Sequence, residues 1–188
     1  MGSEVTSKHL QGVTDLTLVA DIKPGLAPSL DACTYETRLA LVMRTFTGLR
    51  SSSREYAVIR PFSDTVERIQ EIHSFRLAVI PPKEGEGVTR RLLLSVGFDG
   101  GWEQYIRRVW RDLGPLLDVM FCNTTDYKSA WDHSFQDYVA WIRSKQLDTG
   151  FFYSATGLSV TDLQYLRQVE KLHREGHANL ELAAAQLT

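Results

Sequence analysis

Three segments of the chain alternate between apolar and polar residues, as half-buried β-strands do. They cover residues 15–22, 73–80 and 91–99. Turn-forming residues follow each segment and would end a strand there: Lys23-Pro24-Gly25, Pro81-Pro82 and Gly100-Gly101. We therefore predict three strands, each with one apolar face and one mixed face.

Other segments place their apolar residues three or four positions apart, which is typical of amphipathic helices. The predicted helices cover residues 29–49, 64–72, 102–113 and 131–142, with a last helix that Thr161 and Gln164 open. The apolar run at 116–122 reads as a fourth strand, and short strands are also possible at 56–60 and 151–153.

The order of these elements is strand, helix, strand, strand, helix, strand. This is the split βαβ pattern of the ferredoxin-like fold, an α+β class with an antiparallel sheet and helices on one face. Two further helices follow at the C-terminal end. We expect a flexible leader (1–14), one domain (15–175) and a tail (176–188).

Because the predicted helices cover only one face of the sheet, the other face needs a partner, a ligand or water. Side chains one residue apart on a strand point to opposite faces, so the apolar sets can be packed beneath the helices. The residues then left on the open face are Thr17, Val19, Asp21, Ser74, Arg76, Ser95, Gly97 and Asp99. This small, polar and charged surface suits a pocket floor or a subunit interface.

Arg76, Asp99 and His73 are the candidate catalytic residues. An arginine on the open face can stabilise a developing anion, and a half-buried carboxylate can serve as an acid or base. Two structural alternatives remain: Arg76 and Asp99 form a simple ion pair, or Asp99 caps the helix that begins near Gly101. His73 falls on the helix-covered face by parity, as a structural residue or a neighbour of the catalytic pair.

Composition restricts the classes of function. The 188 residues include 21 Lys and Arg against 23 Asp and Glu, which argues against generic electrostatic binding to nucleic acid or anionic membranes. No apolar run is long enough to span a membrane. Two cysteines and no signal-peptide core make the cytoplasm the expected compartment. No metal site is predicted, since His173 and His177 lack an acidic third ligand.

Nine aromatic residues allow two interpretations, as the lining of an apolar pocket or as ordinary core. They are Trp102, Trp110, Trp131, Phe135, Tyr138, Trp141, Phe151, Phe152 and Tyr153.

Three phrases of the chain resemble a group of ferredoxin-like modules associated with haem peroxidase-type proteins. They are Leu16-Thr-Leu-Val-Ala-Asp-Ile-Lys-Pro-Gly25, Ile72-His-Ser-Phe-Arg76 and Phe98-Asp-Gly-Gly-Trp102. More broadly, residues 15–175 are similar to the dimeric α+β-barrel superfamily, in which two such units close their open sheet faces into a barrel. The resemblance implies a homodimer, with haem as a possible cofactor. Dye-decolorising peroxidases carry Gly-x-x-Asp-Gly, and here Val96 stands at the first glycine of that motif.

Three functions follow from this reading. The first is an accessory module of oxidative metabolism that binds a small organic ligand or a haem-type cofactor and pairs through its open sheet face. The second is an enzyme of the same superfamily, a monooxygenase, cyclase or peroxidase, that uses Arg76 and Asp99 with His73 nearby. The third is a purely structural dimerisation module.

Overall fold

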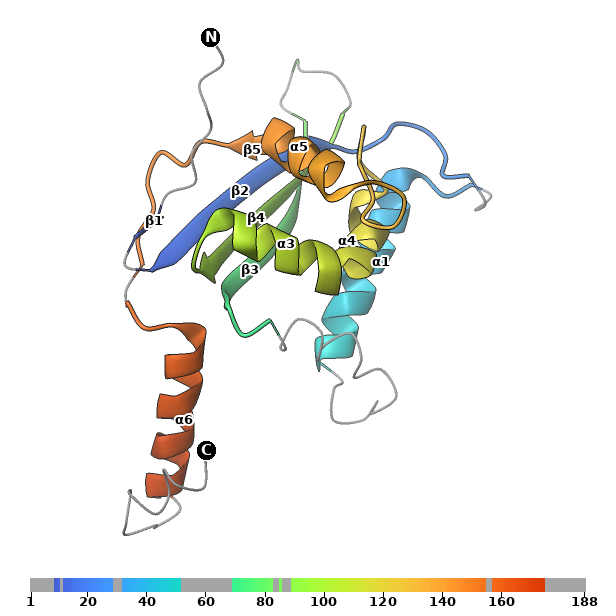
Figure 1. Cartoon of the computed structure of the whole chain (residues 1–188). Helices are drawn as coiled ribbons and strands as arrows, with labels where there is room; N and C mark the ends of the chain where they lie inside the picture. The colour runs from blue at the N-terminus through green and yellow to red at the C-terminus, as the bar shows by residue number, and fades with distance from the viewer. Residues whose placement is uncertain are drawn as a thin grey trace.

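The protein is an α+β protein with one antiparallel sheet (Figure 1). The computed structural model describes residues 9–10, 12–28, 32–51, 69–82, 85, 89–154 and 157–174. The elements in chain order are β1 (His9–Leu10), β2 (Val13–Asp21), α1 (Tyr35–Ser51), β3 (Ile72–Ile80), β4 (Arg91–Asp99), α3 (Trp102–Asp112), α4 (Gly114–Phe121), α5 (Phe135–Lys145), β5 (Gln146–Leu147) and α6 (Val160–Arg174).

Strand β4 lies at the centre of the sheet, between β2 and β3, and is antiparallel to both. The outer edge of β2 is shared by the two-residue strands β1 and β5, which also pair with it in antiparallel fashion. The three strands predicted from alternation therefore lie together in one sheet, and the segment at 91–99 has the predicted bounds.

The core lies between this sheet and helices α3, α4 and α5, which cover one of its faces (Figure 1). Strand β4 points four buried side chains at the helices, Leu92, Leu94, Val96 and Phe98, and β2 adds Leu16, Leu18 and Ala20. Phe98 stacks on Tyr105 of α3 with 3.7 Å between ring centroids. The predicted division of β2 and β4 into an apolar and a mixed face is therefore confirmed.

The prediction of a strand at 116–122 is wrong, because this run forms helix α4. Pro115 stands in the first turn of α4, a position where its missing N–H costs no hydrogen bond. The run is apolar on nearly every side, and such a run shows no period that separates a buried strand from a buried helix. The edge strand that follows the helices is instead β5, and residues 151–153 form no strand.

Three helices begin elsewhere than the sequence predicted. Helix α1 begins at Tyr35, six residues after the predicted start at residue 29. Helix α5 begins at Phe135, after a capping box formed by Ser134 and Asp137, so Trp131 precedes the helix and is 83% exposed. Helix α6 begins at Val160. The predicted helix at 64–72 and the possible strand at 56–60 fall largely outside the described residues, although Ile69 lies in a turn and Ile72 in β3.

Within the part of the chain that the structure describes, no helix combines the length and the hydropathy needed to cross a bilayer.

We expect Phe98→Ala to lower the free energy of unfolding by about 3–5 kcal/mol, because it removes a fully buried ring from the central strand. Phe75→Ala is the control, since Phe75 lies on the neighbouring strand but is 42% exposed. Urea denaturation measures both variants. Equal losses at the two positions would contradict this description of the core.

Candidate functional site

His73 leaves the helix-covered face because strand β3 contains a β-bulge. Ile72 pairs with Phe98 and Ser74 pairs with Gly97, so His73 is the extra residue between them. Ile72 packs against the core. The predicted position of His73 on the helix-covered face is therefore wrong, because strand parity does not continue through a bulge.

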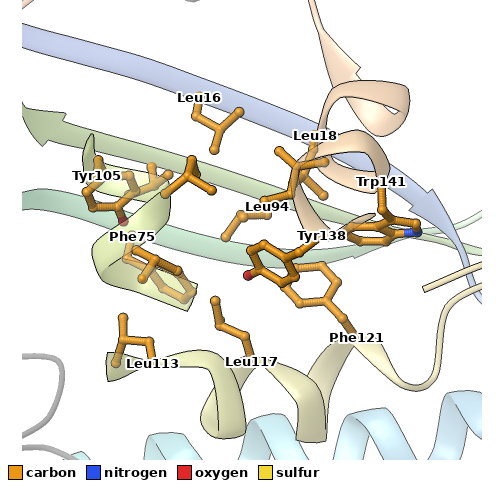
Figure 2. A pocket seen from close by; sticks show the side chains of 14 residues that line it. Leu16, Leu18, Phe75, Leu94, Tyr105, Leu113, Leu117, Phe121, Tyr138 and Trp141 are labelled. Carbon is orange, nitrogen blue, oxygen red and sulfur yellow. The ribbon is translucent and has the colours of Figure 1, made fainter. Parts of the chain in front are cut away.

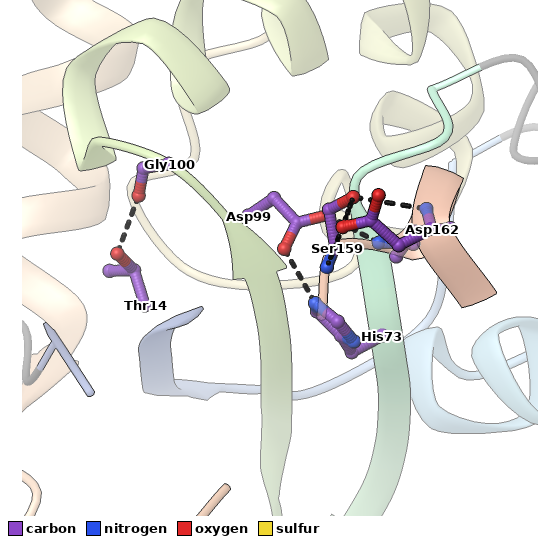
Figure 3. A network of polar contacts seen from close by, with 7 residues as sticks. Thr14, His73, Asp99, Gly100, Ser159 and Asp162 are labelled. Atoms are coloured by element: carbon purple, nitrogen blue, oxygen red, sulfur yellow. Dashed lines mark hydrogen bonds and ion pairs between the residues drawn. The ribbon is translucent and has the colours of Figure 1, made fainter. Parts of the chain in front are cut away.

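The carboxylate of Asp99 joins three elements at the end of β4 (Figure 3). Its Oδ1 lies 2.6 Å from Nε2 of His73, which is the donor because an ionised carboxylate only accepts. Its Oδ2 accepts the backbone N–H of Val160, the first residue of α6, at 2.8 Å. The side chains of His73 and Asp99 are only 16% and 18% exposed. Asp99 therefore fixes the bulge of β3 and the start of α6 to β4.

The start of α6 has a second cap next to Asp99 (Figure 3). The Ser159 hydroxyl donates to Asp162 at 2.7 Å, and the backbone N–H of Asp162 donates back to that hydroxyl at 3.1 Å. The predicted cap at Thr161 and Gln164 is wrong by two residues. The Ser-x-x-Asp pattern at 159–162 was the signal that could have located this cap.

A partly buried acid, Glu71, lies beside this cluster. The backbone N–H of Asp99 donates to the Glu71 carbonyl oxygen at 2.8 Å, and Arg108 of α3 forms an ion pair with the Glu71 carboxylate. Burial raises the pKa of the Glu71 carboxyl above its usual value, the charge of Asp99 adds to the effect, and Arg108 opposes it. On the other side, the Thr14 hydroxyl donates to the Gly100 carbonyl oxygen at 2.6 Å.

Arg76 lies on the same face as Asp99 but away from it. It pairs with Ser95, four residues along β4, which corresponds to about 13 Å of strand. Its guanidinium makes no ion pair or hydrogen bond with any residue that the structure describes. The structure thus brings together His73 and Asp99 and leaves Arg76 apart.

Neither structural alternative for Asp99 holds as stated. The predicted ion pair with Arg76 is absent among the described residues, and Gly101 caps α3 without a side-chain hydrogen bond. Asp99 does act at a helix N-terminus, but that helix is α6, 61 residues further along the chain. No local pattern in the sequence indicates so distant a partner.

The open face is narrower than the sequence predicted, because the segment that follows β5 is bound to one end of it. The Thr149 hydroxyl donates to Asp15 at 2.5 Å, and Val160 donates to Asp99. Asp15 and Val13, which lie at this end of the face, are only 7% and 3% exposed. The partly or fully exposed remainder consists of Thr17, Val19, Asp21, Ser74, Arg76, Ala78, Ile80, Arg91, Leu93 and Ser95.

A cavity of about 30 Å³ lies inside the core, between the sheet and α3, α4 and α5 (Figure 2). Its lining includes Phe75, Tyr138 and Trp141 among aliphatic side chains. The space is about that of one water molecule in the liquid, far below the volume of a typical ligand pocket. This cavity is therefore not a binding site for an organic molecule or haem.

The nine aromatic residues divide between core and surface. Phe135, Tyr138 and Trp141 are buried core residues, and the partly buried Trp102 and Trp110 pack against the core. Trp131, Phe151 and Tyr153 are largely exposed, and Phe152 is half-buried. Burial also raises the pKa of the Tyr138 hydroxyl well above its usual value.

Sequence reasoning missed Asn123, which is fully buried after α4. Its Oδ1 accepts from Nε of Arg38 in α1 at 2.6 Å, and its Nδ2 donates to the Met120 carbonyl oxygen at 2.9 Å. Its own carbonyl oxygen accepts the N–H of Lys23. Asn123 therefore joins α1, α4 and the segment after β2, a role with no local sequence signal.

Among the residues described, no three His, Cys, Asp or Glu side chains are grouped as a metal site would require. Searches against family models, curated proteins and solved structures found no match to the chain.

We expect Asp99→Ala to destabilise the start of α6 by about 1–2 kcal/mol, because the Val160 N–H and the His73 ring both lose their acceptor. Hydrogen exchange at the amides of residues 160–163 should become faster. Asp21→Ala is the matched control, since Asp21 is an exposed carboxylate of the same face. Unchanged exchange in Asp99→Ala would contradict the anchoring role of this carboxylate.

Titration of Glu71 should make stability depend on pH. Because the folded state raises the pKa of this carboxyl above 4.5, the folded protein keeps the proton to a higher pH than the unfolded chain does. Its contribution to stability is therefore present below that value and is lost as the pH rises through the folded pKa. Relative to Glu71→Gln, which cannot titrate, the wild-type free energy of unfolding should fall from acidic pH toward neutrality. A rise would contradict the assignment.

Proposed function

We propose that the protein is a ligand-binding module of ferredoxin-like topology that pairs with a second copy through its open sheet face and holds a small organic acid there. The strand order β5-β2-β4-β3 supports this topology, because it joins two βαβ halves through antiparallel neighbours. The resemblance to peroxidase-associated modules extends the proposal to an accessory role in oxidative metabolism.

The proposal rests on one observation: the exposed side chains of this face form rows across the three long strands. Val19, Leu93 and Ala78 stand side by side across the three long strands and form an apolar row. Two rows with charged and polar residues flank it: Asp21, Arg91 and Ile80 on one side, and Thr17, Ser95 and Arg76 on the other. An apolar centre with a polar rim is the usual anatomy of a protein interface.

The side chain of Arg76 favours a ligand that carries a carboxylate. An exposed guanidinium without an ion-pair partner among the described residues can bind a carboxylate through two parallel hydrogen bonds. The hydroxyls of Ser95 and Thr17 stand in the same row and can complete the polar contacts, while the apolar row takes the body of the ligand. Arg76 is thus assigned a binding role.

Haem does not fit the described residues of a single copy. Nε2 of His73 is hydrogen-bonded to Asp99, and both side chains are mostly enclosed. The interior cavity is far too small for a porphyrin. No step of the proposed function therefore involves haem.

An enzyme is the second candidate, and the 2.6 Å contact between His73 and Asp99 favours it. A carboxylate that orients a histidine is the arrangement that supports a general base in several enzyme classes. If this pair is catalytic, His73→Gln abolishes turnover of an identified substrate while the melting temperature stays nearly unchanged. If the wild type shows no measurable turnover and His73→Gln only lowers the stability, the His73–Asp99 pair has a structural role.

The pairing is tested by light scattering over a range of protein concentrations. We expect at least a dimer for the wild type, and we expect Leu93→Lys, which places a charge in the apolar row, to associate only at higher protein concentration. Gln104→Lys adds the same charge at an exposed position of α3 and should leave the dimer intact. A wild type that stays monomeric at high concentration would overturn the proposal.

Ligand binding is tested by the thermal shift of the protein with a panel of aliphatic and aromatic carboxylic acids. A ligand at 100 times its Kd stabilises the folded state by about 2.7 kcal/mol, and Arg76→Gln should abolish that shift. Arg44→Gln, at an exposed arginine of α1, should not. If the protein dimerises but no acid stabilises it, the remaining interpretation is a purely structural dimerisation module. Haemin is added in a separate experiment, and we expect its Soret absorption band to be the same with and without the protein.

A further inference from the structure

The exposed apolar side chains are concentrated in one part of the molecule. We use the name C-terminal arm for residues 147–154 and 157–174, which comprise the segment after α5 and helix α6. Six of the eleven most exposed large apolar residues among those described belong to it: Leu147, Phe151, Tyr153, Leu158, Tyr165 and Leu166. Such a concentration marks an interaction surface.

Helix α6 is the part of the arm that most needs a partner. It extends away from the sheet and the other helices (Figure 1), and none of its 15 residues is buried. Tyr165, Leu166, Val169 and Leu172 recur at spacings of three and four residues and form an apolar stripe on one side of the helix, whereas Val160 and Leu163 lie progressively further round it. Isolated helices of this length are marginal in water, so a packed apolar stripe is required to stabilise it.

The charges at the two ends of α6 indicate which partner fits. Asp162 lies in its first turn, and Lys171, His173 and Arg174 lie in its last turn. Glu170 forms an ion pair with Arg174 at 2.6 Å, and with Lys171 this end keeps a net positive charge. Two copies side by side in antiparallel orientation place each acidic first turn against the basic last turn of the other copy. A two-fold axis produces both contacts at once, whereas a parallel pair would bring like charges together.

We propose that α6 packs in antiparallel orientation against α6 of a second copy, with the apolar stripe at the contact. The two helices cross near their midpoint, beside Leu166. This contact involves a different surface from the open sheet face, and it holds whether or not that face pairs.

Site-directed cross-linking tests the geometry. Leu166 and Gln168 are equally close to the midpoint of α6, but they lie on opposite sides of the helix. In a Cys33→Ser/Cys122→Ser background, Leu166→Cys should form an intermolecular disulfide under mild oxidation, and Gln168→Cys should form little. Equal yields at both positions, or none at Leu166→Cys, would overturn the proposal.

A second measurement separates this contact from pairing through the sheet. The Leu166→Cys disulfide should still form in the Leu93→Lys background. The α6 contact is wrong, while the sheet-face pairing stands, in either of two cases. In the first, the disulfide forms only when Leu93 is intact; in the second, the wild type dimerises but Leu166→Cys forms no disulfide. A wild type that is monomeric at high concentration would overturn both contacts. A dimer that Leu93→Lys does not weaken, and that cross-links through Leu166→Cys, would retain the α6 contact and reject the sheet-face pairing.

Discussion

The alternation of side chains along β4 is the constraint on which the rest of the structure depends. Four apolar side chains on one side of this central strand reach the core, and every neighbouring strand and covering helix packs against them. Since successive side chains of a strand point to opposite faces, the same register fixes Leu93, Ser95, Gly97 and Asp99 on the other side. The core and the candidate binding surface are thus two consequences of one strand.

Asp99 is a candidate catalytic residue by its chemistry, but in the structure its carboxylate connects separate elements of the fold. Both of its oxygens are occupied, one by His73 from the bulge and one by the backbone of α6. A carboxylate held in this way joins distant elements, and Arg76, which the sequence predicted to act with it, lies in another row of the sheet, opposite Ser95. In the proposed function, ligand binding therefore centres on Arg76, whereas the contact of Asp99 with Val160 fixes where helix α6 begins.

The fold was predictable where the signal was local and periodic. The strands at 15–22, 73–80 and 91–99 and the helix after Gly101 follow from spacing alone. The candidate site was predictable only in part, since Asp99 and His73 were selected but their partner Val160 was not. The apolar run of α4 carries no period, β5 has only two residues, and the contact of Thr149 with Asp15 spans 134 residues.

The sequence by itself determined which sides of the strands are apolar, because burial requires a period of two along a strand and of 3.6 along a helix. Only the tertiary structure decided that a bulge turns His73 toward Asp99 and that the arm occupies one end of the open face. These features depend on single contacts between segments far apart in the chain. Such contacts leave no periodic trace in the sequence, since each involves one residue on either side.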